Sequence, residues 1–187
     1  MYWYKCINID LSLSKIERNS KFHKEAFSLL EEKLIEEFHF KKEDLKYKYG
    51  VQGKPYLEKS PLNFSISHCN DIVVCAVNKM EIGIDIEDIK IANKYAIKKS
   101  LTEVEKGNME LSNIKDEYFF RIWSLKEAFI KCLGEGLSYG MKNVEFNISN
   151  KYENIICNVR GFKFKQEKIS INNKEYIISV AWEVCNG

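Results

Sequence analysis

The order in which strand-like and helical segments follow one another restricts the fold of this chain most strongly. Three short apolar segments succeed one another between residues 63 and 86, and the last two are rich in the Ile and Val that favour strands. A strand-like run at 2–9 and an amphipathic helical pattern at 22–38 precede them, and largely helical sequence follows from 88 to 133. Because strands and helices do not alternate in a sustained way, we predict an α+β fold and argue against a doubly wound nucleotide-binding fold.

The second half of the chain carries clear helix boundaries. Thr102 and Glu105 have the spacing of a capping box, in which each side chain satisfies a free backbone amide of the other. A long helix is expected within 115–133, ended by Gly134, because glycine readily adopts the left-handed conformation that closes a helix. Three further strands are expected at about 144–148, 154–164 and 175–184.

Charge and composition exclude several classes of function. The 187 residues carry 29 basic and 27 acidic side chains, a net charge of +2, which is low for a dedicated nucleic-acid binder. The N-terminus does not have the pattern of a secretory signal, and the longest clean apolar run, 72–77, is too short to span a bilayer. We therefore expect a cytoplasmic protein without nucleic-acid or membrane partners. Reduced, mostly buried thiols are expected at the six cysteines 6, 69, 75, 132, 157 and 185.

Two carboxylates occupy alternate positions of the strand predicted at 82–86. In a strand, alternate side chains share a face, so Asp85 and Glu87 project together while Ile84 and Ile86 enter the core. Two acids on one face repel each other unless a positive charge lies between them, and Mg²⁺ prefers such carboxylate oxygens. The plainer interpretation is a strand end with solvated acids.

A third carboxylate and a lysine share one face of the long helix. Glu127 and Lys131 are one turn apart, and the aromatic residues Phe120 and Trp123 flank them. A surface ion pair is the simpler interpretation, but the aromatic setting favours a site. An acid for Mg²⁺ and a lysine for phosphate oxygens would suit the binding of a pyrophosphate.

Two shorter motifs provide candidate anion contacts. Ser67 and His68 end a predicted strand and could donate hydrogen bonds to a phosphate, although a lone histidine there is more often structural. Lys54 is held between Gly53 and Pro55, which fix a turn.

The order of these motifs resembles that of the 4′-phosphopantetheinyl transferases. Gly-Lys-Pro at 53–55 is followed by NFSISH at 63–68, GIDIE at 83–87 and WSLKEAFIK at 123–131. The resemblance is to the long, single-chain, pseudo-dimeric branch, the surfactin-synthetase-activating or Sfp-like type. It implies two similar α+β lobes, here 1–88 and 89–187, related by a pseudo-two-fold axis with the active cleft between them. It also implies a monomer.

The resemblance implies the reaction as well. A serine of an apo acyl or peptidyl carrier protein would receive the 4′-phosphopantetheine group of coenzyme A, with release of 3′,5′-ADP. Asp85, Glu87 and Glu127 would hold Mg²⁺, for which Mn²⁺ could substitute, and Lys131 and His68 would contact phosphate oxygens. The serine proton would pass to Glu127 or to a metal-bound water. These two routes stay open.

The same resemblance implies a coenzyme-binding set, which comprises Lys54, Ser67, His68, Lys126, Lys131 and Ser28. The 3′-phosphate contacts are the departure from the family pattern, because no arginine lies near Ser28. Lys24 or Ser28 would take their place. A pair of lysines, Lys98 and Lys99, stands where many relatives have aromatic residues, which affects the surface for the carrier.

Two competing functions are compatible with the same residues. A magnesium-dependent phosphodiesterase would use the three carboxylates but would need no protein acceptor. A non-catalytic module would bind coenzyme A or a carrier without reaction, and loss of one of the four motif residues would favour it. Asp85, Glu87, Glu127 and Lys131 are all present. The identity of the carrier, from fatty-acid, polyketide or nonribosomal-peptide synthesis, is left open.

Overall fold

The computed structural model describes residues 1–10, 12–149 and 152–184. The first half contains β1 (Tyr2–Cys6), α1 (Lys15–Phe38), the 3₁₀ turn η1 (Lys42–Asp44), β2 (Tyr47–Tyr49), β3 (Pro55–Leu57), β4 (Asn63–Cys69) and β5 (Ile72–Asn78). The second half contains β6 (Ile82–Asp88), α2 (Lys94–Ser100), α3 (Glu103–Leu111), α4 (Lys115–Leu133), the 3₁₀ turns η2 (Gly136–Tyr139) and η3 (Met141–Asn143), β7 (Phe146–Ile148), β8 (Ile155–Cys157), β9 (Phe162–Ile171) and β10 (Lys174–Glu183).

The two halves have the same connectivity. In the first, strand β1 and helix α1 lead through the two-stranded ribbon β2–β3 to the hairpin β4–β5, and the sheet order is β1-β5-β4. In the second, strand β6 and helix α4 lead through the ribbon β7–β8 to the hairpin β9–β10, and the order is β6-β10-β9. The insertion of α2 and α3 distinguishes the second half. The expected α+β fold of two similar lobes is confirmed, although the sequence shows no internal repeat.

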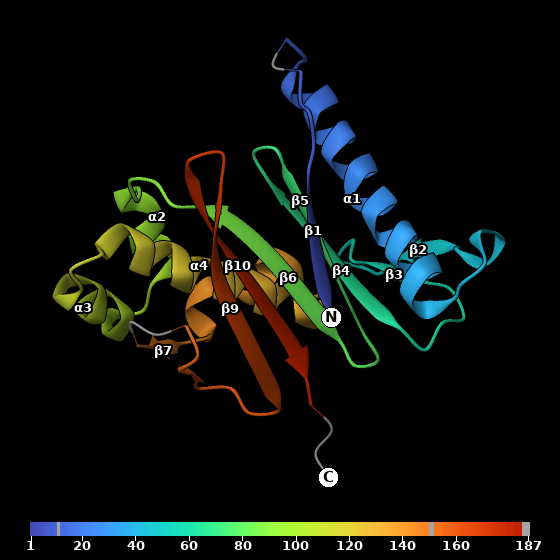
Figure 1. The fold of residues 1–187 in the computed structure, drawn as a ribbon. Coiled ribbons are helices and arrows are strands. Elements are labelled where there is room, and N and C mark those ends of the chain that lie inside the picture. Colours follow the sequence, from blue (N-terminus) through green and yellow to red (C-terminus); the bar gives the residue numbers. More distant parts are fainter. Residues whose placement is uncertain (11, 150–151, 185–187) are drawn as a thin grey trace.

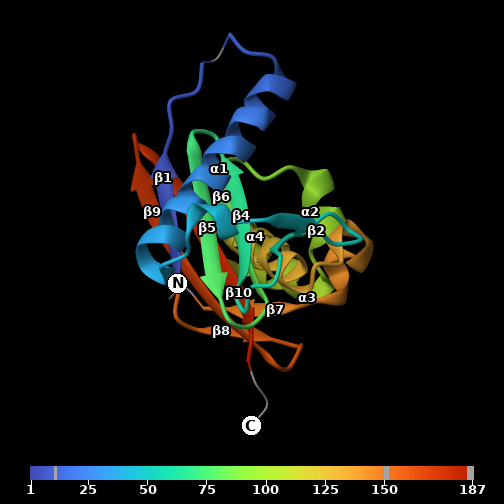
Figure 2. The same cartoon turned by 90° about the vertical axis from the view of Figure 1, so that its right-hand side faces the viewer.

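The elements form four layers (Figures 1 and 2). Helix α1 covers the outer face of the first sheet, α4 covers the outer face of the second, and the two sheets face each other. Strand β5 is apolar on both faces and contributes Val73, Cys75 and Val77 to the core beneath α1. Its alternate residues meet Ile82, Ile84 and Ile86 of β6 in the core between the sheets.

The boundary between the lobes lies earlier in the chain than expected. Strand β6 pairs with β10 and not with β5, so it opens the second lobe instead of closing the first. The predicted division at residue 88 is therefore wrong, and the lobes meet at 79–81. The sequence is misleading here because β4, β5 and β6 look like three successive strands of one sheet.

Helix α1 and strand β9 are longer than expected. Ser14 and Glu17 form a capping box, so α1 begins at Lys15. The apolar stripe begins only at Phe22, after the mostly polar residues of the first turns. The single strand expected at about 154–164 is divided into β8 and the beginning of β9. Strand β9 continues to Ile171 through a charged stretch, because it is an edge strand whose side chains alternate between the protein and solvent. The capping box of α3 and the left-handed end of α4 at Gly134 are confirmed.

Gly83 allows α4 to approach β6 closely. A β-carbon at this position would lie 1.9 Å from the Ala128 carbonyl oxygen and 2.4 Å from the Cys132 amide nitrogen. Any side chain at residue 83 would therefore push the helix away from the strand. The contact places the helix residues Glu127 and Lys131 beside the strand residue Asp85.

The remaining expectations concern the cysteines and the membrane. Within the described ranges the cysteines are free thiols, but only Cys75 and Cys132 are buried, and Cys185 lies outside the described residues. None of the helices in the described part of the chain has the length and apolar character needed to cross a membrane.

Candidate active site

Asp85, Ser67 and Lys131 form a compact polar centre where β4, β6 and α4 meet. The Lys131 ammonium donates to Asp85 Oδ1 at 2.6 Å and to Ser67 Oγ at 2.8 Å. Ser67 Oγ in turn donates to Asp85 Oδ1 at 2.9 Å. The Asp85 side chain is 6% exposed and that of Lys131 is 31% exposed, so the lysine reaches from the cleft to a buried carboxylate. The structure thus brings three of the predicted residues together.

The edge of β6 is joined to β4 by side chains and not by strand pairing. Ser65 Oγ accepts a hydrogen bond from the Ile84 amide, two residues before the Ser67 contact along β4. Strand β4 therefore follows β6 along the side that faces away from β10. This arrangement fixes the polar centre between the two lobes.

Glu87 lies next to Asp85 on the same face of β6 and is held by α4. The Trp123 indole N–H donates to Glu87 Oε1 at 2.9 Å. Burial, and then the negative charge of Asp85, raise the pKa of Glu87 to about 7. The predicted shared face of Asp85 and Glu87 is confirmed, and Trp123 is identified as a contact of the site.

Glu127 faces the same cleft from the helix. Burial, and then the charge of Asp85, raise the pKa of Glu127, while Lys131 acts in the opposite direction. Asp85 therefore lies between two carboxylates, each of which it makes harder to ionise. Lys131 supplies the positive charge that partly balances the three acids.

The donor set fits a divalent cation. Asp85 Oδ2 is buried and has no hydrogen-bond partner among the described residues, although a buried carboxylate oxygen normally has one. The raised pKa values of Glu87 and Glu127 reflect repulsion that a cation would relieve. Ligand atoms of Cys69, Glu87 and Asp88 lie within 4.8 Å of one another. Asp85, Glu87 and Glu127 do not form such a group within the described residues, and the Lys131 ammonium lies at Asp85 instead.

Lys54 lies at one side of the centre, in a cavity of about 300 Å³ that Glu127 and Lys131 also line. Its ammonium donates to Glu81 Oε2 at 2.6 Å and to the Cys132 carbonyl at 2.9 Å. These bonds fix the turn at 53–55 against the end of α4. The structure thus places Lys54 in the same cavity as the predicted metal ligand Glu127.

His68 lies at the other side, in a cavity of about 690 Å³. Its ring stacks on Phe22 of α1, with centroids 4.5 Å apart and an interplanar angle of 6°. Burial, and then the Lys131 cation, lower the pKa of His68, so its imidazole is mainly neutral at pH 7. Lys15 and Arg18, from the first turn of α1, line the same cavity.

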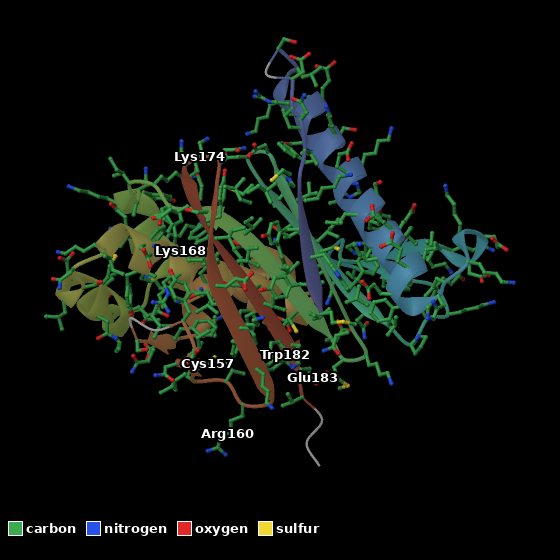
Figure 3. The ribbon with its side chains drawn as sticks, viewed as in Figure 1. Cys157, Arg160, Lys168, Lys174, Trp182 and Glu183 are labelled. Carbon is green, nitrogen blue, oxygen red and sulfur yellow. The ribbon has the colours of Figure 1, made fainter. Side chains whose placement is uncertain are left out.

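Sequence reasoning missed Lys15 and Arg18. They precede the apolar stripe at 22–38 from which the helix is predicted, so the sequence pattern assigns them no role. The capping box at Ser14 and Glu17 is the signal that would have placed them on α1. From the opposite side Lys174, at the turn end of the β9–β10 hairpin (Figure 3), completes the cationic rim of this cavity.

A further cavity, of about 990 Å³, is lined by β1, α1 and the β9–β10 hairpin. Trp182 lines it from the far end of β10, opposite the end that carries Lys174 (Figure 3). Its lining includes none of the three predicted metal ligands, so it is separate from the active cleft.

The structure does not bring Lys126 and Ser28 to the site. Lys126 is fully buried on another face of α4, where its ammonium donates to Glu105 Oε2, the Ser100 carbonyl and the Met141 carbonyl at 2.6–3.0 Å. Its expected contact with coenzyme A is corrected, because all three of its donors are used inside the protein. Ser28 is exposed on α1 and lines none of the three cavities described above.

Comparison with known proteins identifies the family. A model of the 4′-phosphopantetheinyl transferase superfamily matches residues 81–181, more than half of the chain. The chain therefore belongs to the 4′-phosphopantetheinyl transferase superfamily, as the motifs predicted.

Individual relatives agree with this assignment. The 4′-phosphopantetheinyl transferase psf-1 of Bacillus pumilus is 39% identical over 103 residues, which are 52% of this chain and 43% of that protein. The 4′-phosphopantetheinyl transferase ffp of Bacillus subtilis is 34% identical over 140 residues, 68% of this chain and 62% of that protein. The chain spans about half the length of the curated relatives it matches. Among solved structures, a Thermotoga maritima holo-[acyl-carrier-protein] synthase has a TM-score of 0.44 at 24% identity, over 56% of this chain and 64% of the other.

Proposed function

We propose that this protein transfers the 4′-phosphopantetheine group of coenzyme A to a serine of an apo carrier protein and releases 3′,5′-ADP. The observation that carries the proposal is the centre of Asp85, Ser67 and Lys131, with Glu87 and Glu127 beside it, between the two lobes. Membership of the superfamily supports it. Acidic ligands and a lysine in one cleft suit a pyrophosphate with its counter-ion.

The main requirement of the reaction is to stabilise the negative charge of the pyrophosphate. A serine oxygen must attack the β-phosphorus while the bond to 3′,5′-ADP breaks, so negative charge builds on the leaving group. Lys131 lies in the centre and would neutralise that charge, and the neutral His68 would donate one hydrogen bond to a phosphate oxygen. Mg²⁺ bound by Asp85, Glu87 and Glu127 would supply further positive charge to the same oxygens.

Glu127 is placed to accept the proton of the incoming serine. It is only half-buried and lines the cavity that Lys54 and Lys131 share, so an incoming hydroxyl could reach its carboxylate. A carboxylate within reach of the attacking hydroxyl can act as its general base. The serine proton would pass to Glu127 as the bond to phosphorus forms.

The cavity beside His68 suits the 3′-phosphate of coenzyme A. Lys15 and Arg18 bring two positive charges to a wall that His68 shares, and the N-terminal end of α1 adds its partial positive charge. These residues replace Lys24 and Ser28 as the candidates for binding the 3′-phosphate.

We assign the protein to the cytoplasm, where coenzyme A and carrier proteins meet. We expect a monomer because both walls of the cleft come from one chain.

Intact-protein mass spectrometry tests the function directly. The protein is incubated with coenzyme A, MgCl₂ and a panel of apo carrier proteins, with and without EDTA. We expect one phosphopantetheine to be added to a carrier, and the gain to disappear with EDTA or when the carrier serine is replaced by alanine. Cleavage of coenzyme A without a carrier would support the phosphodiesterase instead. Binding of coenzyme A without any transfer would support the non-catalytic module.

A further inference from the structure

Lys126 and Glu105 form an ion pair whose two side chains are both 0% exposed. The three donors of Lys126 reach Glu105 Oε2, the Ser100 carbonyl and the Met141 carbonyl. Glu105 accepts in addition from the backbone amides of Thr102 and Phe146, at 2.8 and 2.9 Å. The pair therefore connects α4 to the end of α2, the start of α3, η3 and β7, with every strong donor and acceptor of both groups satisfied.

The position of Lys126 around α4 is informative. At about 100° per residue, Glu127 and Lys131 lie roughly 100–140° around the helix from Lys126, and the strand contacts Ala128 and Cys132 lie roughly 200–240° around it. The face that carries the site is thus flanked on one side by the contact with Gly83 and on the other by the buried ion pair. The buried ion pair lies off the line of the strand contact, so it adds a polar restraint to the rotation of a helix whose apolar residues pack in the core of the second lobe.

The partner of Lys126 belongs to the segment that follows β6. That segment leaves the strand after Asp88, forms α2 and α3, and returns to begin α4. The ion pair closes this loop by tying its middle to α4 one residue before Glu127. The ion pair thereby restrains the position of α4, which carries Glu127, relative to β6, which carries Asp85 and Glu87.

We propose that Lys126 and Glu105 are positioning residues that set the rotation of α4, so that Trp123 and Glu127 meet the carboxylates of β6. The proposal rests on the proposed function for its catalytic consequence. Its structural consequence is independent of any reaction, because the hydrogen bond from the Trp123 indole to Glu87 joins α4 to β6 and should weaken when the helix rotates.

The test compares exchange of the Trp123 indole N–H by NMR, and transfer kinetics, in three variants. Lys126→Met keeps most of the length of the side chain and removes its charge. We expect the folded variant to show at least tenfold faster indole exchange and at least tenfold lower kcat. Arg121→Met is the matched control, because it also removes a buried cation of α4, one that bonds Gln166 and the Ser149 carbonyl. Arg121→Met should lower the melting temperature while leaving indole exchange and kcat unchanged.

A double variant is included because the single variant Lys126→Met could unfold. Lys126→Met combined with Glu105→Gln removes both charges, so it avoids the unpaired buried carboxylate that destabilises the single variant. If it folds with fast indole exchange and low kcat, the positioning role is supported. Wild-type exchange and kcat in either folded variant would overturn it and leave the pair a role in stability alone. A wild-type protein that transfers nothing would contradict the proposed function, while indole exchange would still decide the rotation of α4.

Discussion

Asp85 is unusual among the residues of the site because its two carboxylate oxygens have opposite surroundings. Oδ1 accepts from Lys131 and from Ser67, while Oδ2 is buried without a partner among the described residues. An unsatisfied buried acceptor costs about 1–3 kcal/mol. Such a cost is typical of a functional site, and a cation bound at Oδ2 would remove it. The free oxygen thus agrees with the metal-binding role inferred for this strand.

Removal of the Glu127 carboxylate should abolish transfer. In Glu127→Ala we expect kcat to fall by at least a thousandfold, because the variant loses a predicted metal ligand and the proton acceptor at once. Since Glu127 is only half-buried, the fold should persist, and circular dichroism serves as the check. Near-normal transfer by a folded variant would refute both roles. Asp85→Ala should remove activity together with its dependence on Mg²⁺.

Glu87 should make the stability of the metal-free protein depend on pH. Its pKa is about 7 in the folded state and about 4.5 in the unfolded state, so the folded protein binds more protons between these values. The stabilising contribution is complete below about pH 4.5 and is lost as pH rises through about 7. We expect denaturant melts of the wild type and of Glu87→Gln to converge at low pH and diverge toward pH 8, with the variant the more stable. A difference independent of pH would contradict the raised pKa.

The chemistry of most site residues could be predicted from the sequence, but their directions could not. Alternation along a strand was enough to place Asp85 and Glu87 on one face, and helical spacing was enough for Glu127 and Lys131. Lys126 was assigned to the ligand because it belongs to the motif that the chain shares with the family. Only the packing of α2 and α3 against α4 shows that it points elsewhere. The identity of a residue does not reveal its partner across the fold.

Among the elements, α4 bears most of the site, and its close contact with β6 determines where its side chains lie. The helix meets the strand at Gly83, where backbone atoms of Ala128 and Cys132 occupy the space of a β-carbon. Both elements are nearly inflexible there because their backbones, not long side chains, are in contact. A small displacement of α4 would therefore move Glu127 and Lys131 together relative to Asp85.

Replacement of Gly83 should test this contact. Gly83→Ala should lower the free energy of unfolding by about 1–3 kcal/mol or more, because overpacking against backbone atoms cannot be relieved by a rotamer change. The displaced helix should also lower kcat. Gly107→Ala is the matched control, since its β-carbon would have no atom within 4 Å. Gly107 lies within α3, so its replacement should be neutral or slightly stabilising. Equal melting temperatures for the two variants would contradict the close approach.

Element types were easier to predict than element limits. Apolar periodicity located α4 and strands β4, β5 and β6, because each buries a regular face. The same signal failed for the second half of β9, where one face is solvated and the residues read as a charged loop. It also could not say which sheet β6 joins, because pairing with β10 depends on residues almost a hundred positions away. Long-range pairing is not encoded in local periodicity.

At the scale of the whole molecule, the cleft and its neighbouring cavity are built from both lobes. The cavity beside His68 takes Lys15 and Arg18 from α1 of the first lobe and Lys174 from the β9–β10 turn of the second. The polar centre likewise joins β4 of the first lobe to β6 and α4 of the second. Neither lobe alone contains the candidate site, so the proposed binding of coenzyme A would depend on how the two lobes pack.

The cationic cavity leads to a prediction about ligand selectivity. The double variant Lys15→Ala/Arg18→Ala should raise the KM for coenzyme A about tenfold or more, because charge-assisted hydrogen bonds contribute about 1.5–3 kcal/mol each. The KM for dephospho-coenzyme A, which lacks the 3′-phosphate, should be unchanged. Lys24→Ala on the exposed side of α1 is the control and should affect neither substrate. Equal losses for both substrates would place the 3′-phosphate elsewhere.

The short connection between the lobes has a further consequence. Only residues 79–81 separate β5 from β6, although each lobe has the same order of strands and helix as the other. The chain therefore holds two matching halves at an effective local concentration in the millimolar range or above. Their association is an internal step, so dilution cannot separate them. The cleft between these lobes should be as complete at nanomolar protein as in a concentrated solution.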